Sequence, residues 1–167
     1  MDNELLMKMT EYYAGQPHRI QHFMKVYAYS RMIGEMERLE SRTQHILEVA
    51  AAVHDIGIKK SEEIYGDSAG NHQEELGPDE ARKMLAGLGY DEELIARVCY
   101  LVGHHHTYTG IDGMDYQILV EADFLVNLFE NEDGINEKAV RSALERIFVT
   151  ESGKAVLKAM FLGGQND

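Results

Sequence analysis

Apolar residues recur at helical spacing along nearly the whole chain, and no segment shows the strict alternation of a half-buried strand. Around residue 50, for example, Leu47, Ala51 and His54 lie at i, i+4 and i+7 and share one face of a helix. The 167 residues contain no internal repeat and no low-complexity linker. The pattern therefore predicts an all-α helical bundle that forms a single domain over residues 1–167.

Turn and cap signals divide this chain into individual helices. Pro17 suits the first turn of a helix that continues to about Glu40. Ser41 or Thr43 caps the next helix, which is expected to end at Gly57. Residues 58–77 are polar and punctuated by glycine, so they predict a loop with one helical turn at 62–65. The remaining helices are expected at residues 3–14, from Pro78 onward, and at 91–106, 115–130, 136–148 and 151–161.

Charge and cysteine content exclude several classes of partner. The formal net charge of −13 argues against sequence-independent nucleic-acid binding and against an anionic membrane surface as partner. No apolar run approaches the roughly 20 residues that span a bilayer. The first residues are acidic and lack the signature of a signal peptide. Cys99 is the only cysteine and is expected to pack rather than react, so we expect a cytoplasmic protein without disulfides.

Four potential metal ligands stand on stretches that otherwise read as buried helix faces. His22 shares a face with Val26, His54 and Asp55 end an alanine-rich apolar run, and Asp123 lies within a second apolar run. A lone inward histidine is usually a hydrogen-bonded core residue, but a carboxylate facing a core costs several kcal/mol unless it is paired or metal-bound. The set of four, drawn from distant segments, therefore predicts one shared cation.

Two imidazoles and two carboxylates suit a particular range of ions. Such a mixed nitrogen and oxygen site favours Mn²⁺, Fe²⁺, Co²⁺, Ni²⁺ or Zn²⁺ over Ca²⁺, which prefers oxygen ligands only. Four protein ligands on an octahedral ion leave about two positions for water and a substrate oxygen. Metal-activated water is then the expected nucleophile, and no covalent intermediate is needed.

The order and spacing of these residues resemble the HD-domain metal-dependent phosphohydrolases. His22 matches the family's first histidine, Val53-His54-Asp55-Ile56-Gly57 matches its His-Asp doublet, and Glu121-Ala122-Asp123 matches its late aspartate. His18 competes for the first position, but His22 keeps the family's distance to the following valine. The resemblance covers about residues 17–130, and the helices over 136–162 are expected to pack on that region. It implies hydrolysis of a phosphate ester, usually in a nucleotide or a nucleotide-like small molecule.

Asp55 and Lys59 are the expected catalytic residues. Asp55 can place one oxygen on the metal and the other on the water, and Lys59 follows the doublet closely enough to hold a phosphate. Lys60, Arg19 and Tyr108 are weaker candidates for substrate binding, and Tyr65 is an alternative to Tyr108 for stacking a base. Both lysines can equally be read as solvated loop residues.

A second metal ion is left open by the sequence. Binuclear members of the family add a histidine about four residues before a helix-starting glycine, where Gln73 stands here and His72 is one residue away. They also add histidines after the next helix, where His105 and His106 stand, while His104 is expected to face elsewhere. These histidines alternatively bind substrate phosphate or simply line the cleft.

Two other functions remain as alternatives. One is a catalytically silent module that binds metal or senses a ligand, and the other is a phosphodiesterase with a binuclear site. Hydrolysis of guanosine alarmones is disfavoured because Ile56-Gly57-Ile58-Lys59 stands where that subgroup carries an acidic pair. The sequence leaves the substrate and the oligomeric state open.

Overall fold

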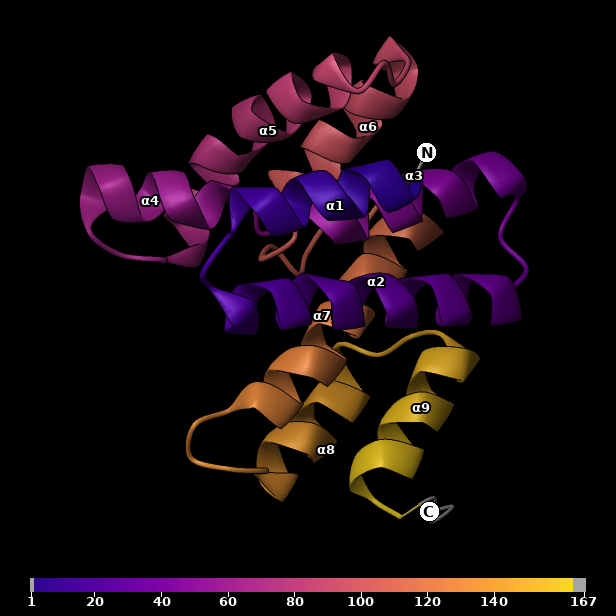
Figure 1. Ribbon diagram of the computed structural model, residues 1–167. Coiled ribbons are helices and arrows are strands. Elements are labelled where there is room, and N and C mark those ends of the chain that lie inside the picture. The colour runs from indigo at the N-terminus through magenta and orange to yellow at the C-terminus, as the bar shows by residue number, and fades with distance from the viewer. Residues whose placement is uncertain (1, 164–167) are drawn as a thin grey trace.

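The computed structural model describes residues 2–163, so Met1 and residues 164–167 of the predicted domain lie outside it. Within the described residues the protein is entirely helical (Figure 1), as predicted. The helices are α1 (Asp2–Tyr12), α2 (Pro17–Met36), α3 (Ser41–Val53), α4 (Gly57–Tyr65), α5 (Gly70–Gly87), α6 (Glu92–Val102), α7 (Met114–Glu130), α8 (Glu137–Arg146) and α9 (Glu151–Phe161).

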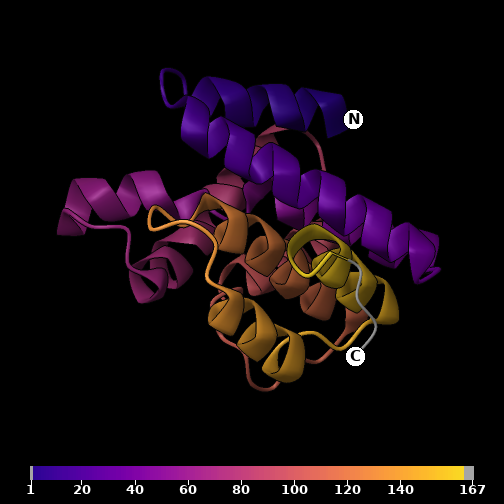
Figure 2. The same cartoon turned by 90° about the horizontal axis from the view of Figure 1, so that it is seen from below.

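Helix α3 forms the centre of the bundle. Every residue from Ile46 to Val53 is buried, because α1, α2, α6 and α7 all pack against it. Figures 1 and 2 show α1 and α2 antiparallel and side by side, with α4 to α6 on one side of the bundle and α8 and α9 near the other. No helix among residues 2–163 is long and apolar enough to cross a membrane.

The prediction of a loop over residues 58–77 is wrong. Two helices, α4 and α5, occupy this segment and leave only residues 66–69 between them, and Pro78 lies inside α5 instead of opening it. One face of α5 buries Gln73, Gly77 and Ala81 at a spacing of four residues. Packing of this face against α4 and α6 therefore outweighs the poor helix propensity of its glycines and proline.

Gly57 allows the start of α4 to approach the backbone of the first half of α5 closely. A Cβ at this position would lie 2.7 Å from the carbonyl oxygen of Gln73 and 2.9 Å from the amide nitrogen of Gly77. Helix α3 thus ends at Val53 and not at Gly57, and residues 54–56 form a turn between α3 and α4. This turn carries the His-Asp doublet.

The buried carboxylate of Glu121 holds the C-terminal helices on the bundle. Its Oε1 accepts hydrogen bonds from the backbone N–H groups of Val149 and Thr150 and from the Gln117 side chain. Its Oε2 accepts the Thr150 hydroxyl, which in turn caps α9. Because four donors converge on one acid, the connection between α8 and α9 is fixed against α7.

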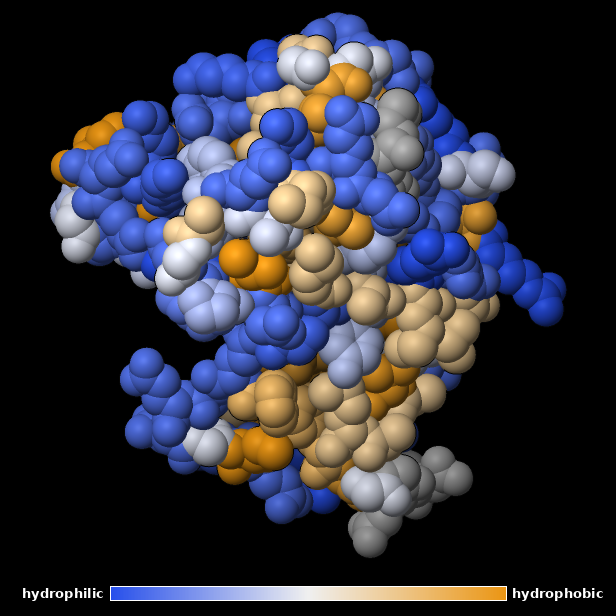
Figure 3. All heavy atoms as spheres, in the orientation of Figure 1, coloured by the Kyte–Doolittle hydropathy of each residue, from blue (hydrophilic) through white to orange (hydrophobic). Residues whose placement is uncertain are grey.

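The face drawn in Figure 3 is polar over much of its area. Figure 3 shows apolar side chains gathered where α9 lies below the end of α2. Met36 on α2 is 55 % exposed and Met160 on α9 is 37 % exposed, whereas Met9 on α1 is fully buried. Only some of the methionines therefore fill gaps in the core.

Candidate metal centre

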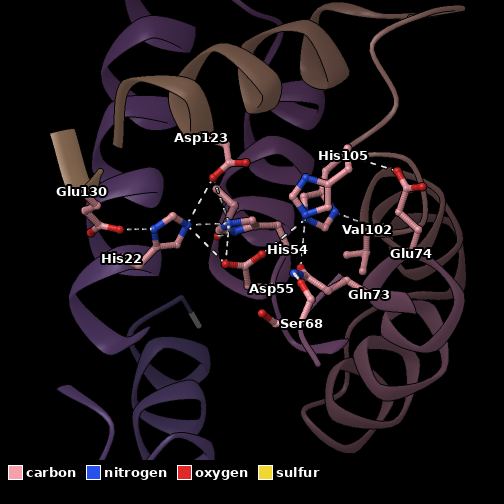
Figure 4. A network of polar contacts seen from close by, with 12 residues as sticks. His22, His54, Asp55, Ser68, Gln73, Glu74, Val102, His105, Asp123 and Glu130 are labelled. Carbon is pink, nitrogen blue, oxygen red and sulfur yellow. Dashed lines mark hydrogen bonds and ion pairs between the residues drawn. The ribbon is translucent and has the colours of Figure 1, made fainter. Parts of the chain in front are cut away.

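Four side chains from three separate segments converge on one point (Figure 4). His22 lies on α2, His54 and Asp55 follow α3, and Asp123 lies on α7. The two histidine Nε2 atoms lie 3.2 Å apart. His22 Nε2 is 3.3 Å from Asp55 Oδ2 and 3.2 Å from Asp123 Oδ1, and the corresponding distances from His54 Nε2 are 3.4 and 3.5 Å. Ligand atoms about 2.1 Å from one ion lie roughly 3.0–3.4 Å apart, so these four residues fit a shared ion.

The hydrogen bonds of the outer ring nitrogens fix which nitrogen carries the proton. His54 Nδ1 donates to the carbonyl oxygen of Ala51 at 2.8 Å, and His22 Nδ1 donates to the carboxylate of Glu130 at 2.7 Å. Carbonyl and carboxylate oxygens only accept, so both protons are on Nδ1 and both Nε2 atoms present lone pairs when the rings are neutral. Two lone pairs at 3.2 Å repel each other unless a cation or a shared proton lies between them.

The site also contains buried atoms that no protein donor satisfies. Within residues 2–163, Asp123 Oδ1 and His105 Nε2 are buried and have no hydrogen-bond partner while the imidazole Nε2 atoms carry no proton. Leaving such atoms unsatisfied costs about 1–3 kcal/mol each. The donor set, its spacing and these unsatisfied atoms all fit a divalent transition metal.

Charges within the cluster raise the pKa values of its histidines and lower those of its aspartates. Burial alone would lower the pKa of His54, but the charge of Asp55 and hydrogen bonds to both aspartates outweigh it and raise that pKa well above its ordinary value. The pKa of His22 is also raised, because its bond to Asp123 and the charge of Asp55 outweigh burial. Against the effect of burial, the histidines hold the pKa values of Asp55 and Asp123 well below the ordinary range. The protons on the imidazoles therefore supply positive charge where a metal would bind.

Helix α1 supports the turn that carries the doublet. The Tyr13 hydroxyl donates to the carbonyl oxygen of Asp55 at 2.7 Å, and the Tyr12 hydroxyl donates to that of Ile56 at 3.3 Å. These bonds tie the backbone of the turn to α1 and so help to fix the positions of His54 and Asp55.

A second group of potential ligands adjoins the first through Asp55. While Asp55 Oδ2 faces His22 and His54, its Oδ1 lies 3.4 Å from His105 Nε2. Asp55, His105 and His106 place one ligand atom each within 4.8 Å of one another. His105 Nδ1 donates to the carbonyl oxygen of Val102 at 2.8 Å, so its Nε2 also presents a lone pair. Of the three predicted candidates for a second ion or phosphate, His72, His105 and His106, the last two thus lie beside the first group.

Gln73, and not His72, faces this second group. Gln73 donates its amide to the carbonyl oxygen of Ser68, which leaves its Oε1 to accept from His106 Nε2 at 3.2 Å. His72 is turned away, where it bonds Asp67 at 2.8 Å and stacks on Tyr65 at 3.9 Å. A one-residue shift could be absorbed by the predicted loop, but each residue of an α-helix turns by about 100°, so α5 brings only Gln73 inward.

His106 is held as a neutral ring. Burial, followed by the charge of His105, lowers its pKa to about 4. Its backbone N–H bonds the Glu74 carboxylate at 3.0 Å, so α5 fixes both its backbone and its ring. A ring fixed in this way can bind a ligand or a substrate oxygen without first losing a proton.

The structure does not bring the predicted lysines to the cavity. Lys59 turns toward α1, where its ammonium bonds the carbonyl oxygen of Tyr12 at 3.3 Å and lies 4.9 Å from the centre of the Tyr12 ring. Lys60 pairs with Glu63 on the surface of α4. Tyr108 packs on the ring of Phe124 with centres 5.1 Å apart and does not line the cavity. Because α4 begins immediately after the doublet, its helical path and not sequence proximity sets where these lysines point.

A cavity of about 620 Å³ opens onto the ligands. Of the predicted substrate-binding residues Arg19 lines it, with its guanidinium paired to Glu62, and His18 lines it as well. Several other side chains that line the cavity were not predicted to do so, namely Gln21, Lys25, Ile58, Gln73, Asn127, Glu130 and Glu132. Helical spacing could have found some of them: Lys25 lies three residues after His22, and Asn127 lies four after Asp123.

An all-helical bundle in which two histidines and two aspartates converge defines a class of metal-site proteins. The HD domain family matches residues 19–147, which is most of the chain. The protein therefore belongs to the HD domain family, and the predicted all-helical fold class is confirmed.

A solved structure described as a predicted HD superfamily hydrolase from an uncultured Thermotogales bacterium has the same fold. It is similar to this chain with a TM-score of 0.67 and 23 % sequence identity over 96 % of this chain and 84 % of the other. No match was found among the curated proteins.

Metal addition is expected to stabilise the protein most strongly at alkaline pH. The raised pKa values of His22 and His54 contribute stability below about pH 6.5 that is lost as the pH rises through them. The lowered pKa values of Asp55 and Asp123 contribute stability above about pH 3.8 that is lost in acid. The metal-free protein should thus be most stable roughly between these values, and above them only a metal ion relieves the facing lone pairs.

Thermal unfolding with and without Mn²⁺ or Zn²⁺ checks this expectation. An ion at about 100 times its Kd adds about 2.7 kcal/mol, which corresponds to roughly 5–10 °C in the unfolding midpoint at alkaline pH. The increase should shrink near pH 5.5, where protons compete for the imidazoles. An increase that is equal or larger in acid would contradict the proposed ligand set.

Proposed function

We propose that this protein is a divalent-metal-dependent phosphohydrolase acting on a phosphate ester of a nucleotide or nucleotide-like small molecule. The observation that carries the proposal is the pair of facing imidazole lone pairs flanked by Asp55 and Asp123 at the wall of a cavity. Its volume of about 620 Å³ lies within the range of about 300–1,000 Å³ that is usual for small-molecule sites. The bound ion supplies Lewis acidity and lowers the pKa of a water molecule.

The protein's own groups have separate roles in this proposal. His22, His54, Asp55 and Asp123 hold the ion, and the second oxygen of Asp55, which faces His105, is placed to accept a proton from water. Arg19 and Lys25 line the cavity and are the groups proposed to meet the phosphate. Lys59 is not proposed in this role, because its ammonium lies on Tyr12.

The alternative of a binuclear phosphodiesterase has one observation in its favour. The group of Asp55, His105 and His106 could hold a second ion that shares Asp55 with the first. Gln73 counts against it, because its amide oxygen binds His106 where a third basic ligand would be needed. We therefore propose one resident ion and a phosphomonoester substrate first.

The partner is proposed to be a small phosphate compound in the cytoplasm. A net charge of −13 disfavours nucleic acid, and the buried Cys99 bonds the carbonyl oxygen of Pro78 instead of forming a disulfide. Because the protein as a whole is acidic, an anionic substrate must be attracted by local positive charge, namely the metal ion and the few cationic side chains at the cavity.

Metal analysis followed by a phosphate-release screen tests the proposal. Purified protein should retain a transition metal and release phosphate from at least one nucleotide with Mn²⁺, Fe²⁺, Co²⁺, Ni²⁺ or Zn²⁺, and a chelator should stop the release. Cleavage of phosphodiesters without release from monoesters would favour the binuclear alternative. Tight metal binding with neither activity would indicate a silent module.

Arg19→Met is expected to raise KM about tenfold on the best substrate found, with kcat little changed. The loss of one charge-assisted hydrogen bond to phosphate costs about 1.5–3 kcal/mol, part of which the Glu62 pairing offsets. Steady-state kinetics measure the effect. Lys59→Met is the matched control and should leave KM unchanged, because its ammonium is held by α1. A larger effect at Lys59 than at Arg19 would overturn this assignment of the phosphate-binding group.

A further inference from the structure

We propose that Glu130 is a positioning residue that fixes the ring of His22 for metal binding. This inference rests on the proposed function, because it concerns the same metal site. Glu130 lies at the end of α7, and its Oε2 accepts the Nδ1 proton of His22 at 2.7 Å (Figure 4). The contact holds the lone pair of Nε2 toward His54, Asp55 and Asp123.

The need for a side chain at this point follows from where His22 lies. His54 comes directly after α3, and His105 lies three residues past the end of α6. The last carbonyl groups of these two helices lack helical partners and accept the two Nδ1 protons. His22 instead lies inside α2, where the preceding carbonyl groups bond the helix's own N–H groups. An acceptor for its Nδ1 must therefore come from another element, and α7 supplies it.

Two contacts hold Glu130 in its place. Its Oε1 pairs with the ammonium of Lys25 at 2.6 Å, and that ammonium lies 5.2 Å from the centre of the Phe129 ring. Lys25 is one turn after His22 on the same helix, so the carboxylate bridges two residues of α2. Glu130 is also in the last turn of α7, where the helix dipole disfavours an acid. Its position is thus explained by these contacts and not by helix propensity.

Glu130 and Asp123 are seven residues apart on one face of α7. The same helix therefore supplies a metal ligand and the acceptor that orients a second ligand on α2. Outer partners of this kind typically contribute 10- to 100-fold to metal affinity. Displacement of α7 relative to α2 would change both contacts together.

Metal affinity measured by competition with a chromophoric chelator tests the inference. Glu130→Ala should weaken Zn²⁺ or Mn²⁺ binding by about 10- to 100-fold. Glu130→Gln keeps an oxygen that can accept the Nδ1 proton and should recover most of the affinity. Glu132→Gln is the matched control for charge, since Glu132 lines the same cavity and is exposed. It should change the affinity by less than about threefold, and equal losses at both positions would overturn the inference.

The protonation of the His22 ring gives a second measurement that needs no metal. Two-bond ¹H–¹⁵N spectra of the metal-free protein, at a pH where the ring is neutral, should show the proton on Nδ1 in the wild type and a mixture of both forms in Glu130→Ala. An unchanged Nδ1 form in Glu130→Ala would overturn the inference even if affinity fell. The two proposals fail separately: a protein that shows these effects but releases no phosphate refutes only the hydrolase activity.

Discussion

Replacement of Asp55 by alanine is expected to abolish both metal retention and turnover. One oxygen of this carboxylate faces His22 and His54, and the other faces His105, so the change removes a ligand from both groups at once. The backbone of the turn should remain in place, because Tyr13 bonds the main-chain carbonyl of Asp55 and not its side chain. Loss of several kcal/mol of transition-state stabilisation corresponds to a decrease of about 10³-fold or more in kcat/KM.

Metal content by atomic spectroscopy and phosphate release on the same preparation measure this effect. Cys99→Ala is the control, since the thiol bonds the carbonyl oxygen of Pro78 and lies outside the cavity lining. It should retain both metal and activity. Normal phosphate release from Asp55→Ala would refute the mechanism proposed for this site.

Glu121→Ala is expected to cause the largest loss of stability. It would leave the N–H groups of Val149 and Thr150, the Thr150 hydroxyl and one Gln117 hydrogen without their acceptor. Breaking a buried network of this kind costs about 3–5 kcal/mol, so we expect the free energy of unfolding to fall by about 4 kcal/mol. The carboxylate also lies directly against Gly153, where any side chain would clash with Glu121 Oε2.

Urea unfolding and amide hydrogen exchange measure this change. The amide of Thr150 should exchange faster than amides of α3, because the loss of Glu121 frees the C-terminal helices before the rest of the bundle. Glu145→Ala, at an exposed position of α8, should change stability by less than about 0.5 kcal/mol. A loss below about 1 kcal/mol for Glu121→Ala would show that the four donors find other acceptors.

The sequence predicted most of the fold because buried helix faces leave a periodic pattern. Helix α2 starts at Pro17 as predicted, and α9 has the predicted bounds, Glu151–Phe161. The prediction for residues 58–77 was wrong because glycine and polar residues are frequent there, and their local propensity favours a loop. What makes these residues helical is the packing of α5 against α4 and α6, with a close approach of backbones at Gly57 and Gly77, and no local window contains these contacts.

In the candidate site, too, the sequence predicted some features and only helix packing decided others. The sequence alone predicted that His22, His54, Asp55 and Asp123 face inward, because each stands on an apolar helix face or at the end of one and a buried charge needs a partner. Only the tertiary structure decided that Gln73 replaces His72, that Lys59 turns to α1, and that Glu130 reaches His22 from the end of α7. These contacts depend on the rotation and packing of one helix relative to another, and a change of one residue in register turns a side chain by about 100°.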